Sequence, residues 1–366
     1  MKVLVTGASG FVGGILTDTL RICGHEVTAV SRSRVEQPGI FYVASPELGP
    51  EADWTPALSG IDAVVHLAGR AHVTSEQVDA KTDQAYLRIN AEGTRALAAQ
   101  CSAAGVKHFI FLSSCHAITG ESDDVLTDRT VPQPVTAYGR SKLAAEEAIK
   151  SVLADSGCAS TILRPPLVYG TDNKANFGLL VKLVQTGIPL PLASVRNRRS
   201  FIYVENLVDL IVACLGHPKA FGKTFLPSDG EDVSTPELIR AIAHANASVE
   251  HGAWRMEHGA IIDGDGRGKI GDGSAPSHTF GRRGDLFALG PSAVLLRSGS
   301  CARHSARLFH FPPSLLNAAG RLPGLGALRK LTSSLYVDSE PIRKDLDWMP
   351  PFSVEEGLRC TLGKRH

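Results

Sequence analysis

Short apolar runs alternate with segments of helical periodicity along the first half of the chain. Strands buried on both faces of a parallel sheet read as continuous apolar runs of about 4–8 residues. Short runs of this kind occupy Val3–Val5, Val27–Val30, Ile40–Val43 and Phe109–Leu112, and Ile61–Gly69 is predicted to be a further strand that ends in a loop of small residues. The intervening segments place apolar residues at helical spacing, most clearly over 15–20 and 86–104. This alternation predicts an α/β fold with a doubly wound parallel sheet.

Three glycines follow the first predicted strand at a spacing of three residues. They are Gly7, Gly10 and Gly13, and a predicted helix begins directly after them. Without a Cβ, the first permits a tight turn, the second lets the backbone approach a pyrophosphate, and the third lets the helix pack close to the strand. The N-terminus of that helix offers free N–H groups and a positive dipole end to phosphates. The pattern predicts a dinucleotide site; the alternative is a chance glycine cluster in a strand–helix loop.

The residues after the second predicted strand bear on the choice of cofactor. A carboxylate at this position binds the ribose hydroxyls of NAD, whereas a basic residue accommodates the extra phosphate of NADP. The chain has Ser31 and Arg32 here. A guanidinium can bind phosphate oxygens bidentately. The sequence therefore favours NADP(H), with NAD(H) as the alternative and a solvated loop arginine as the interpretation without function.

Tyr138 and Lys142 have the spacing that places two side chains on one face of a helix. A free tyrosine has a pKa of about 10, which is too high for it to act as a base at neutral pH. A lysine ammonium on the same face is expected to lower that pKa. Ser114 follows the strand Phe109–Leu112 and reaches the same sheet edge. The three residues predict a proton-transfer site beside a hydride carrier; for the tyrosine and lysine alone, the alternative is a surface pair.

Composition narrows the class of protein. The chain has 366 residues and a formal net charge of +1, which gives no electrostatic argument for nucleic acid or an anionic membrane as partner. No apolar run reaches the length of a membrane span. The seven cysteines form no C-x-x-C pair, as in a reduced, cytoplasmic protein, and no metal site is predicted. The first strand lies at the N-terminus, so no signal peptide is expected.

Taken in chain order, the motifs resemble the extended short-chain dehydrogenase/reductases, the NAD-dependent epimerase/dehydratase family. The matching motifs are Thr6-Gly7-x-x-Gly10-x-x-Gly13, Leu67-Ala68-Gly69, Asn90-x-x-Gly93-Thr94, Ser114 and Tyr138-x-x-x-Lys142. The resemblance covers Met1 to about Ala247 and resumes from about Leu308. Leu163–Gly170 and Asn197–Phe201 are similar to the subgroup of UDP-sugar 4-epimerases and 4-keto-sugar reductases of surface-polysaccharide pathways.

The resemblance implies roles for individual residues. The implied catalytic residues are Ser114, Tyr138 and Lys142. The implied cofactor-binding residues are Gly7, Ser9, Gly10, Phe11, Val12, Gly13, Ser31, Arg32, Glu47, Leu48, Leu67, Ala68, Gly69, Asn90, Tyr138, Lys142 and Pro165. The implied substrate-binding residues are Ser114, His116, Asn176 and Arg199, with Arg199 on the nucleotide diphosphate. The family also implies a homodimer formed through the helices that carry Asn90 and Tyr138.

Three departures from the family pattern sharpen the expected function. Ser31 replaces the acidic residue of NAD-retaining epimerases, which favours exchangeable NADPH and a reductase. Leu167 stands where galactose epimerases carry an asparagine. Cys115 and His116 stand where 4,6-dehydratases carry the acid and base for water elimination, so dehydration is not expected. The leading hypothesis is reduction of a UDP-4-keto-sugar; the alternatives are a UDP-sugar 4-epimerase with retained NAD and a non-catalytic NAD(P)-binding protein.

The expected domains are a Rossmann lobe over 1–165, to which 200–228 return, and a smaller substrate lobe over 166–366. A segment rich in Gly, Arg and His with little periodicity interrupts the second lobe at 248–306. Its composition predicts a loop or disorder. Three interpretations remain for this insertion: a surface loop, a partner-binding segment, or a lesion that weakens the substrate lobe.

Overall fold

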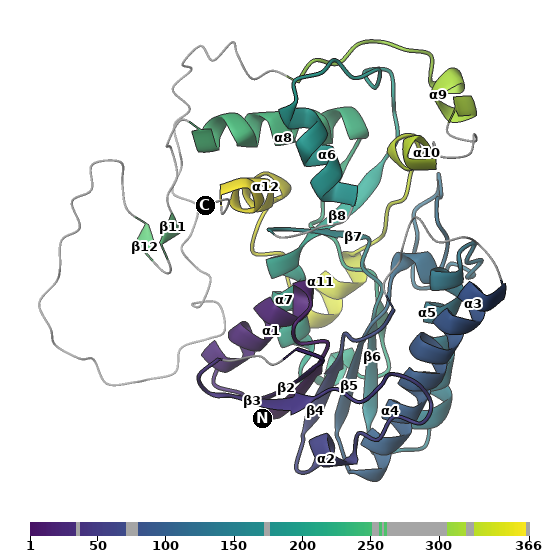
Figure 1. Ribbon diagram of the computed structural model, residues 1–366, viewed down its shortest axis with the longest axis vertical. Coiled ribbons are helices and arrows are strands. Elements are labelled where there is room, and N and C mark those ends of the chain that lie inside the picture. The colour runs from purple at the N-terminus through teal and green to yellow at the C-terminus, as the bar shows by residue number, and fades with distance from the viewer. Residues whose placement is uncertain are drawn as a thin grey trace, which may run out of the picture.

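A large parallel β-sheet forms the first lobe (Figure 1). The computed structural model describes residues 1–33, 37–70, 80–171, 176–250, 256–257, 260–261, 306–319 and 326–363. Within these residues the sheet has seven strands in the order β3-β2-β1-β4-β5-β6-β9, all parallel. The strands are β1 (Lys2–Thr6), β2 (Glu26–Ser31), β3 (Ile40–Ala44), β4 (Ala63–His66), β5 (His108–Leu112), β6 (Ala159–Leu163) and β9 (Thr224–Phe225). The order reverses at β1, as in a doubly wound fold, and confirms the predicted fold class.

Strand β1 illustrates why a strand that is buried on both faces of the sheet consists of an unbroken run of apolar residues. Its side chains alternate between the two faces of the sheet. Val3 and Val5 pack with Leu16 in the hydrophobic cluster on one face, whereas Leu4 packs with Leu97 in the cluster on the other. Because helices cover both faces, neither side of this strand can be polar.

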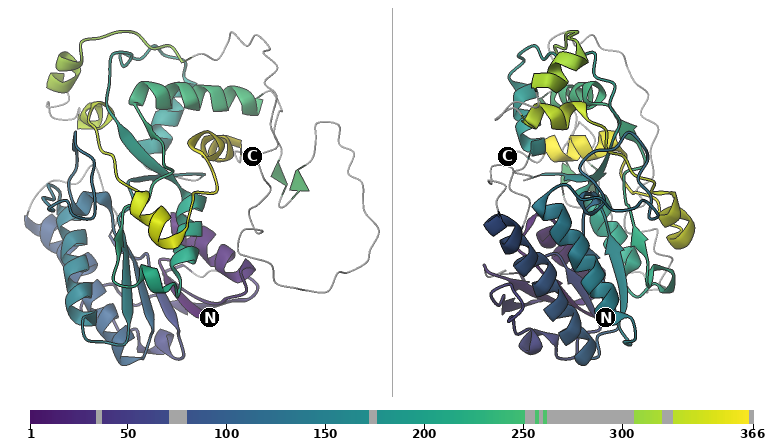
Figure 2. Two further views of the ribbon diagram at one scale, coloured as in Figure 1. Left: turned by 180° about the vertical axis from the view of Figure 1, so that it is seen from behind. Right: turned by 90° about the vertical axis from the view of Figure 1, so that its right-hand side faces the viewer.

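Helices form a layer on each face of the sheet (Figures 1 and 2). One cluster joins the sheet to α1 (Phe11–Ile22), α7 (Val204–Cys214) and α11 (Glu340–Leu346). The other joins it to α2 (Thr55–Leu58), α4 (Gly93–Ala103) and α5 (Ala137–Leu153). The helix predicted around 86–104 is observed as three pieces: α3 (Ala80–Tyr86), the π-helical segment η1 (Leu87–Glu92) and α4. Two short 3₁₀ turns, η2 (Cys115–Ala117) and η3 (Pro218–Ala220), complete this lobe.

The second lobe is built on a small sheet in the order β10-β8-β7. Its strands are β7 (Leu167–Tyr169), β8 (Arg199–Tyr203) and β10 (Asp232–Val233). Its helices are α6 (Asn176–Gln185), α8 (Thr235–Glu250), α9 (Pro313–Ala319), α10 (Gly326–Thr332) and α12 (Val354–Gly363). An aromatic cluster that includes Tyr169, Phe177, Phe201 and Tyr203 fills the space between this sheet and α6, α8 and α12.

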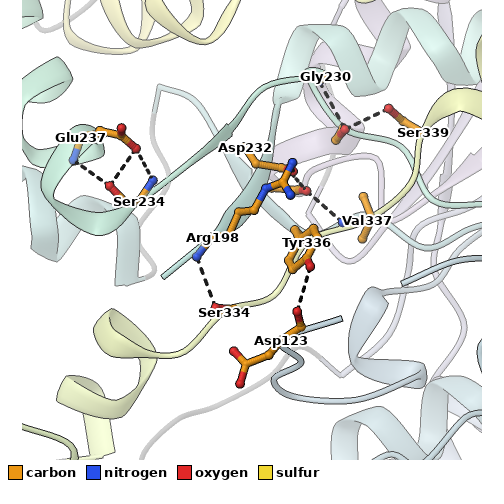
Figure 3. Close-up of polar contacts among 12 residues, drawn as sticks. Asp123, Arg198, Gly230, Asp232, Ser234, Glu237, Ser334, Tyr336, Val337 and Ser339 are labelled. Atoms are coloured by element: carbon orange, nitrogen blue, oxygen red, sulfur yellow. Dashed lines mark hydrogen bonds and ion pairs between the residues drawn. The ribbon is translucent and has the colours of Figure 1, made fainter. Parts of the chain in front are cut away.

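A seam of backbone pairing joins the two lobes. The loop after η2 runs beside the segment after α10, where Leu126 and Val337 form a parallel bridge. The Tyr336 hydroxyl donates to the Asp123 carbonyl at 2.8 Å, as Figure 3 shows. The segment that carries Ser114 at its start is thereby tied to the second lobe.

The domain boundaries of the chain stay a prediction, but the elements around 200–228 divide. Strand β8 lies in the small sheet, whereas α7 packs under the large sheet and β9 pairs with β6. The sequence had assigned this whole segment to the first lobe; residues 199–203 instead pair with β7 because both strands bury aromatic side chains in the second lobe.

Most of the predicted insertion at 248–306 lies outside the described residues. At its start, α8 extends to Glu250. Two short strands, β11 (Met256–Glu257) and β12 (Ala260–Ile261), pair antiparallel within it. Among the helices that are described, none combines the length and the apolar composition that crossing a membrane requires.

Candidate active site

The glycine turn between β1 and α1 is sterically demanding. Gly7 has a φ of +70°, in the left-handed region that favours glycine. A Cβ on Gly7 would lie 2.9 Å from the Ala68 nitrogen, and a Cβ on Gly13 would lie 2.2 Å from the Gly7 carbonyl oxygen. Both contacts are closer than non-bonded atoms tolerate. Gly7 is therefore packed tightly against the loop after β4, and Gly13 is packed tightly against the turn itself.

The N-terminus of α1 suits an anion. Gly10 is the N-cap residue and supplies no side-chain hydrogen bond, and the first turn holds no acidic residue. Ser9 is exposed beside it, while Phe11 and Val12 pack against the aromatic cluster of the second lobe. Free N–H groups at a helix start bind phosphate readily. These residues fit the pyrophosphate of a dinucleotide, and the cofactor contacts of Phe11 and Val12 stay a prediction.

The residues predicted to meet the adenosine half lie at the ends of β2 and β3. Ser31 is buried, and its hydroxyl donates to the Ser33 carbonyl. Arg32 is exposed. Glu47 is exposed, whereas Leu48 is half-buried against the core. The position where a ribose-binding carboxylate is expected thus carries a hydroxyl that is already engaged by the backbone.

A buried polar chain supports the loop Leu67-Ala68-Gly69 and was missed by the sequence analysis. The Thr6 hydroxyl lies 2.7 Å from His66 Nδ1, and His66 Nε2 lies 2.9 Å from the Thr94 hydroxyl. The Thr6 oxygen also accepts from the nitrogens of residues 67 and 68, both at 3.1 Å. Burial, reinforced by the Lys142 charge, lowers the pKa of His66 to about 3, so the ring is neutral. In the sequence, the indication of this chain was His66 itself, a histidine at the end of an otherwise apolar strand.

Asn90 positions the same loop from the π-helical segment. Its amide oxygen accepts from the Arg70 nitrogen at 2.7 Å. Its amide nitrogen donates to the Arg70 carbonyl at 3.1 Å and to the Ser141 hydroxyl at 3.0 Å. Asn90 therefore links the β4 loop to α5 and is engaged by protein groups; the direct cofactor contact stays a prediction.

Ser114, Tyr138 and Lys142 meet at the carboxyl edge of β5. The Ser114 hydroxyl hydrogen-bonds with the Tyr138 phenol. The Lys142 ammonium lies 5.9 Å from the centre of the Tyr138 ring and donates to the Leu112 carbonyl at 2.8 Å. A Cβ on Gly139 would lie 2.2 Å from the His116 carbonyl oxygen, so this glycine lets α5 approach the strand end. Topology thus brings together the three predicted catalytic residues, whose roles stay a prediction.

The pKa of Tyr138 departs from the sequence prediction. Burial raises it above the usual value, with the neighbouring Cys115 acting in the same direction and the Ser114 hydrogen bond in the opposite one. The expected lowering by Lys142 is not the net result, because burial of the phenol itself is the largest effect. Burial lowers the pKa of Lys142 to about 8. At neutral pH the site therefore holds a neutral phenol beside an ammonium.

The floor of the site is fixed by the segment after β6. The Pro165 carbonyl accepts from the Cys115 nitrogen at 2.9 Å, and Pro165 is buried. The His116 and Tyr138 rings meet edge to face, 6.4 Å between centres. Burial raises the pKa of the Cys115 thiol to about 11, which keeps it uncharged. His116 thus packs against the phenol ring.

Two cationic residues, Arg199 and Lys330, interact in the second lobe. Arg199 is first in β8, and its guanidinium donates to the carbonyls of Lys330 at 2.6 Å and Ser333 at 3.2 Å. Its charge lowers the pKa of the Cys115 thiol, against the larger raising effect of burial. Arg199 and burial together lower the pKa of Lys330, with burial the larger cause. Two cations on neighbouring elements fit a diphosphate. Asn176 is the first residue of α6, and its side chain lies outside the described residues.

Comparisons with known proteins agree with this geometry. The profile of the NAD dependent epimerase/dehydratase family matches residues 3–226. The chain is 32% identical to a UDP-glucose 4-epimerase of Vibrio cholerae, over 98% of this chain and 94% of the relative. It is 29% identical to the N-acetyl-alpha-D-glucosaminyl-diphospho-ditrans,octacis-undecaprenol 4-epimerase of Escherichia coli O157:H7, over 66% of this chain and 71% of the relative.

The backbone also resembles solved structures. It superposes on MoeE5 in complex with UDP-glucuronic acid and NAD with a TM-score of 0.66, covering 99% of this chain and 98% of that one at 22% identity. At this identity the likeness shows a shared fold, which includes both lobes.

Proposed function

This chain belongs to the NAD dependent epimerase/dehydratase family, and from that premise we propose that it moves a hydride at C4 of a UDP-sugar with a nicotinamide dinucleotide. The observation that carries the proposal is the meeting of Ser114, Tyr138 and Lys142 at one sheet edge, next to the glycine turn. When bound, the dinucleotide exchanges the hydride with the sugar carbon. The protein then has to bind the sugar nucleotide, exclude water and move one proton at the sugar oxygen.

Tyr138 is the group that moves this proton. Its raised pKa keeps the phenol protonated at neutral pH, so it can donate to a developing alkoxide. The Ser114 hydroxyl is within reach of the same oxygen and orients it. The Lys142 ammonium, 5.9 Å from the ring centre, offsets the negative charge left on the phenolate.

We propose reduction of a UDP-4-keto-sugar by NADPH as the physiological direction, in the synthesis of an O-antigen type surface polysaccharide. Ser31 at the end of β2 offers no carboxylate to a ribose, and the exposed Arg32 can pair with a 2′-phosphate. A phenol that holds its proton suits reduction, in which the tyrosine acts as the acid.

The second candidate is 4-epimerisation with retained NAD. The names of the two relatives described above favour it, since both are 4-epimerases. It needs the same three residues, with Tyr138 first accepting and then returning the proton. Dehydration is not proposed, because the uncharged Cys115 thiol and His116 provide no paired acid and base.

Arg199 and Lys330 are proposed to hold the diphosphate of the substrate, with Asn176 at the start of α6 beside it. A guanidinium and an ammonium together match its negative charge. A homodimer through the helices that carry Asn90 and Tyr138 is proposed as well. Light scattering at micromolar concentration should give twice the chain mass; a mass of one chain would exclude the dimer.

The deciding experiment identifies the cofactor of the purified protein. Bound dinucleotide is released with acid and analysed by mass spectrometry, and UDP-glucose, UDP-N-acetylglucosamine and their 4-keto-6-deoxy derivatives are then offered in an NMR assay. An empty protein that binds NADPH more tightly than NADH and reduces the keto sugar supports the reductase. Stoichiometric retained NAD with interconversion of C4 epimers establishes the epimerase instead. Dinucleotide binding without turnover of any sugar would indicate a non-catalytic binding protein.

A further inference from the structure

A buried ion pair lies directly beneath the candidate active site. The Arg164 guanidinium donates from Nε to both Glu146 carboxylate oxygens, at 3.0 and 3.1 Å, and from Nη2 to Oε2. The Ser113 hydroxyl donates to the same carboxylate. The side chains of Arg164 and Glu146 are 5% and 1% exposed, so water does not screen this contact. Such desolvated pairs are weak evidence of stability by themselves, which leaves room for another role.

Each member of this cluster adjoins a residue already placed in the site. Ser113 precedes Ser114 at the end of β5, and Arg164 precedes Pro165 at the end of β6. Glu146 lies one helical turn after Lys142, on the same face of α5. The Ser113 nitrogen also donates to the Leu163 carbonyl at 2.7 Å, which holds the two strand ends together. One carboxylate thus connects three elements that carry site residues.

The Lys142 ammonium interacts electrostatically with this cluster. Within the part of the chain that the structure describes, the titratable groups recorded as interacting with it are His66 from β4 and Tyr138 and Glu146 from its own helix. His66 is neutral, and Tyr138 is a neutral phenol. Glu146 is therefore the negative charge that raises the pKa of Lys142 against the lowering caused by burial.

We infer that Ser113, Glu146 and Arg164 form a positioning cluster that keeps the Lys142 ammonium charged and aligned with Ser114 and Tyr138, a role that rests on the function proposed above. Glu146 supplies the charge. Arg164 and Ser113 hold its two oxygens, so that the carboxylate cannot turn away from the helix face. None of the three touches the reacting atoms.

The test measures the titration of Lys142 in the full-length protein without substrate. Lysines are labelled with ¹³C at Cε, and the Lys142 signal is assigned by its loss in Lys142→Arg. The wild-type signal should titrate near pH 8, following the pKa of about 8. In Glu146→Gln/Arg164→Met, which removes both buried charges and leaves neither unpaired, the midpoint should fall by about 1 pH unit or more.

The control is Asp229→Asn, which removes a buried carboxylate of the second lobe. It should leave the Lys142 midpoint at the wild-type value. An unchanged midpoint in the double variant, or an equal shift in the control, overturns the inference. If the double variant does not fold, Glu146→Asp replaces it: withdrawing the carboxylate by one methylene should lower the midpoint, and an unchanged midpoint again overturns the inference.

A second readout separates this inference from the proposed function. With an active substrate, the alkaline limb of the kcat/KM profile should move downward in pH together with the Lys142 midpoint. A merely structural cluster would lower kcat evenly at all pH values and leave the limb in place, which would count against the inference. If no sugar nucleotide turns over, the function fails, while the NMR titration still decides whether Glu146 sets the charge of Lys142.

Discussion

The two lobes assemble their binding groups over different distances along the chain. In the first lobe, each motif is contiguous, and the parallel sheet brings the motifs together at the carboxyl ends of β1, β4 and β5. In the second lobe, Arg199 is held by carbonyls 131 and 134 residues away, beyond the predicted insertion. Strand order alone predicts the first arrangement, whereas the second depends on tertiary contacts that no local pattern encodes.

Each lobe also buries a titratable group: a base, His66, in the first lobe and an acid, Asp229, in the second. His66 lies between two threonines in the first lobe, and burial lowers its pKa to about 3. Asp229 lies in the second lobe, where Tyr169 and Asn206 donate to it, and burial raises its pKa to about 6. Burial thus disfavours the charged imidazole of His66 in the first lobe and the charged carboxylate of Asp229 in the second, so these two groups respond to pH in opposite directions.

Tyr138→Phe should show the largest effect and should be confined to chemistry. Removing the hydroxyl takes away the proton donor, so kcat is expected to fall by about 10²–10⁴-fold. Dinucleotide binding, measured by fluorescence, and thermal stability should stay close to wild type, since the ring still packs against His116. Wild-type kcat in this variant would remove Tyr138 from the mechanism.

Gly13→Ala should damage the first lobe alone. Its Cβ would lie 2.2 Å from a backbone oxygen, and overpacking of this kind costs typically about 1–3 kcal/mol in unfolding free energy. Dinucleotide affinity should fall with it. Gly14→Ala is the matched control, because its Cβ meets no atom closer than 3.9 Å, and a helical alanine is more stable than glycine by up to about 1 kcal/mol. Urea unfolding should separate the two variants; equal stabilities would mean that the turn is not tightly packed.

The difference in predictability follows from these contacts. The glycine turn, the strand ends and the pair Tyr138–Lys142 could be predicted because each depends on neighbours in sequence and on sheet order. The direction of the Tyr138 pKa could not, since it depends mainly on burial of the phenol, with Cys115 acting in the same direction, rather than on spacing. Lys330 was missed for a similar reason: nothing near it in sequence indicates that it meets Arg199.

Arg199→Gln tests whether the second lobe holds a diphosphate. Hydrogen bonds to a charged group contribute about 1.5–3 kcal/mol, so the affinity for UDP should fall by about 10- to 100-fold. Arg198→Gln is the matched control. The Arg198 guanidinium pairs with the Asp232 carboxylate at 3.1 Å and lies over the Tyr336 ring (Figure 3). Calorimetry with UDP should find affinity close to wild type for Arg198→Gln. Equal losses in the two variants would indicate that UDP binds through net charge rather than through a built site.

The smallest expected effect separates the lobes by pH. In the unfolded state the His66 imidazole binds a proton near pH 6.5, whereas in the folded state it does so only near pH 3. The contribution of neutral His66 to the free energy of unfolding is therefore fully present above pH 6.5 and is lost as the pH falls toward 3. Between pH 6 and 5 this loss should be about 1 kcal/mol, and His66→Gln, which removes the titratable imidazole, should not show it. Asp229 acts with the opposite sign, because its folded pKa of about 6 exceeds its unfolded value. Its contribution is present below pH 3.8 and is lost as pH rises through 6, so Asp229→Asn should steepen the acid loss while His66→Gln flattens it. Urea unfolding from pH 4.5 to 7 measures how steeply the free energy of unfolding depends on pH in each variant. If both substitutions change this slope in the same direction, His66 and Asp229 do not contribute with opposite signs.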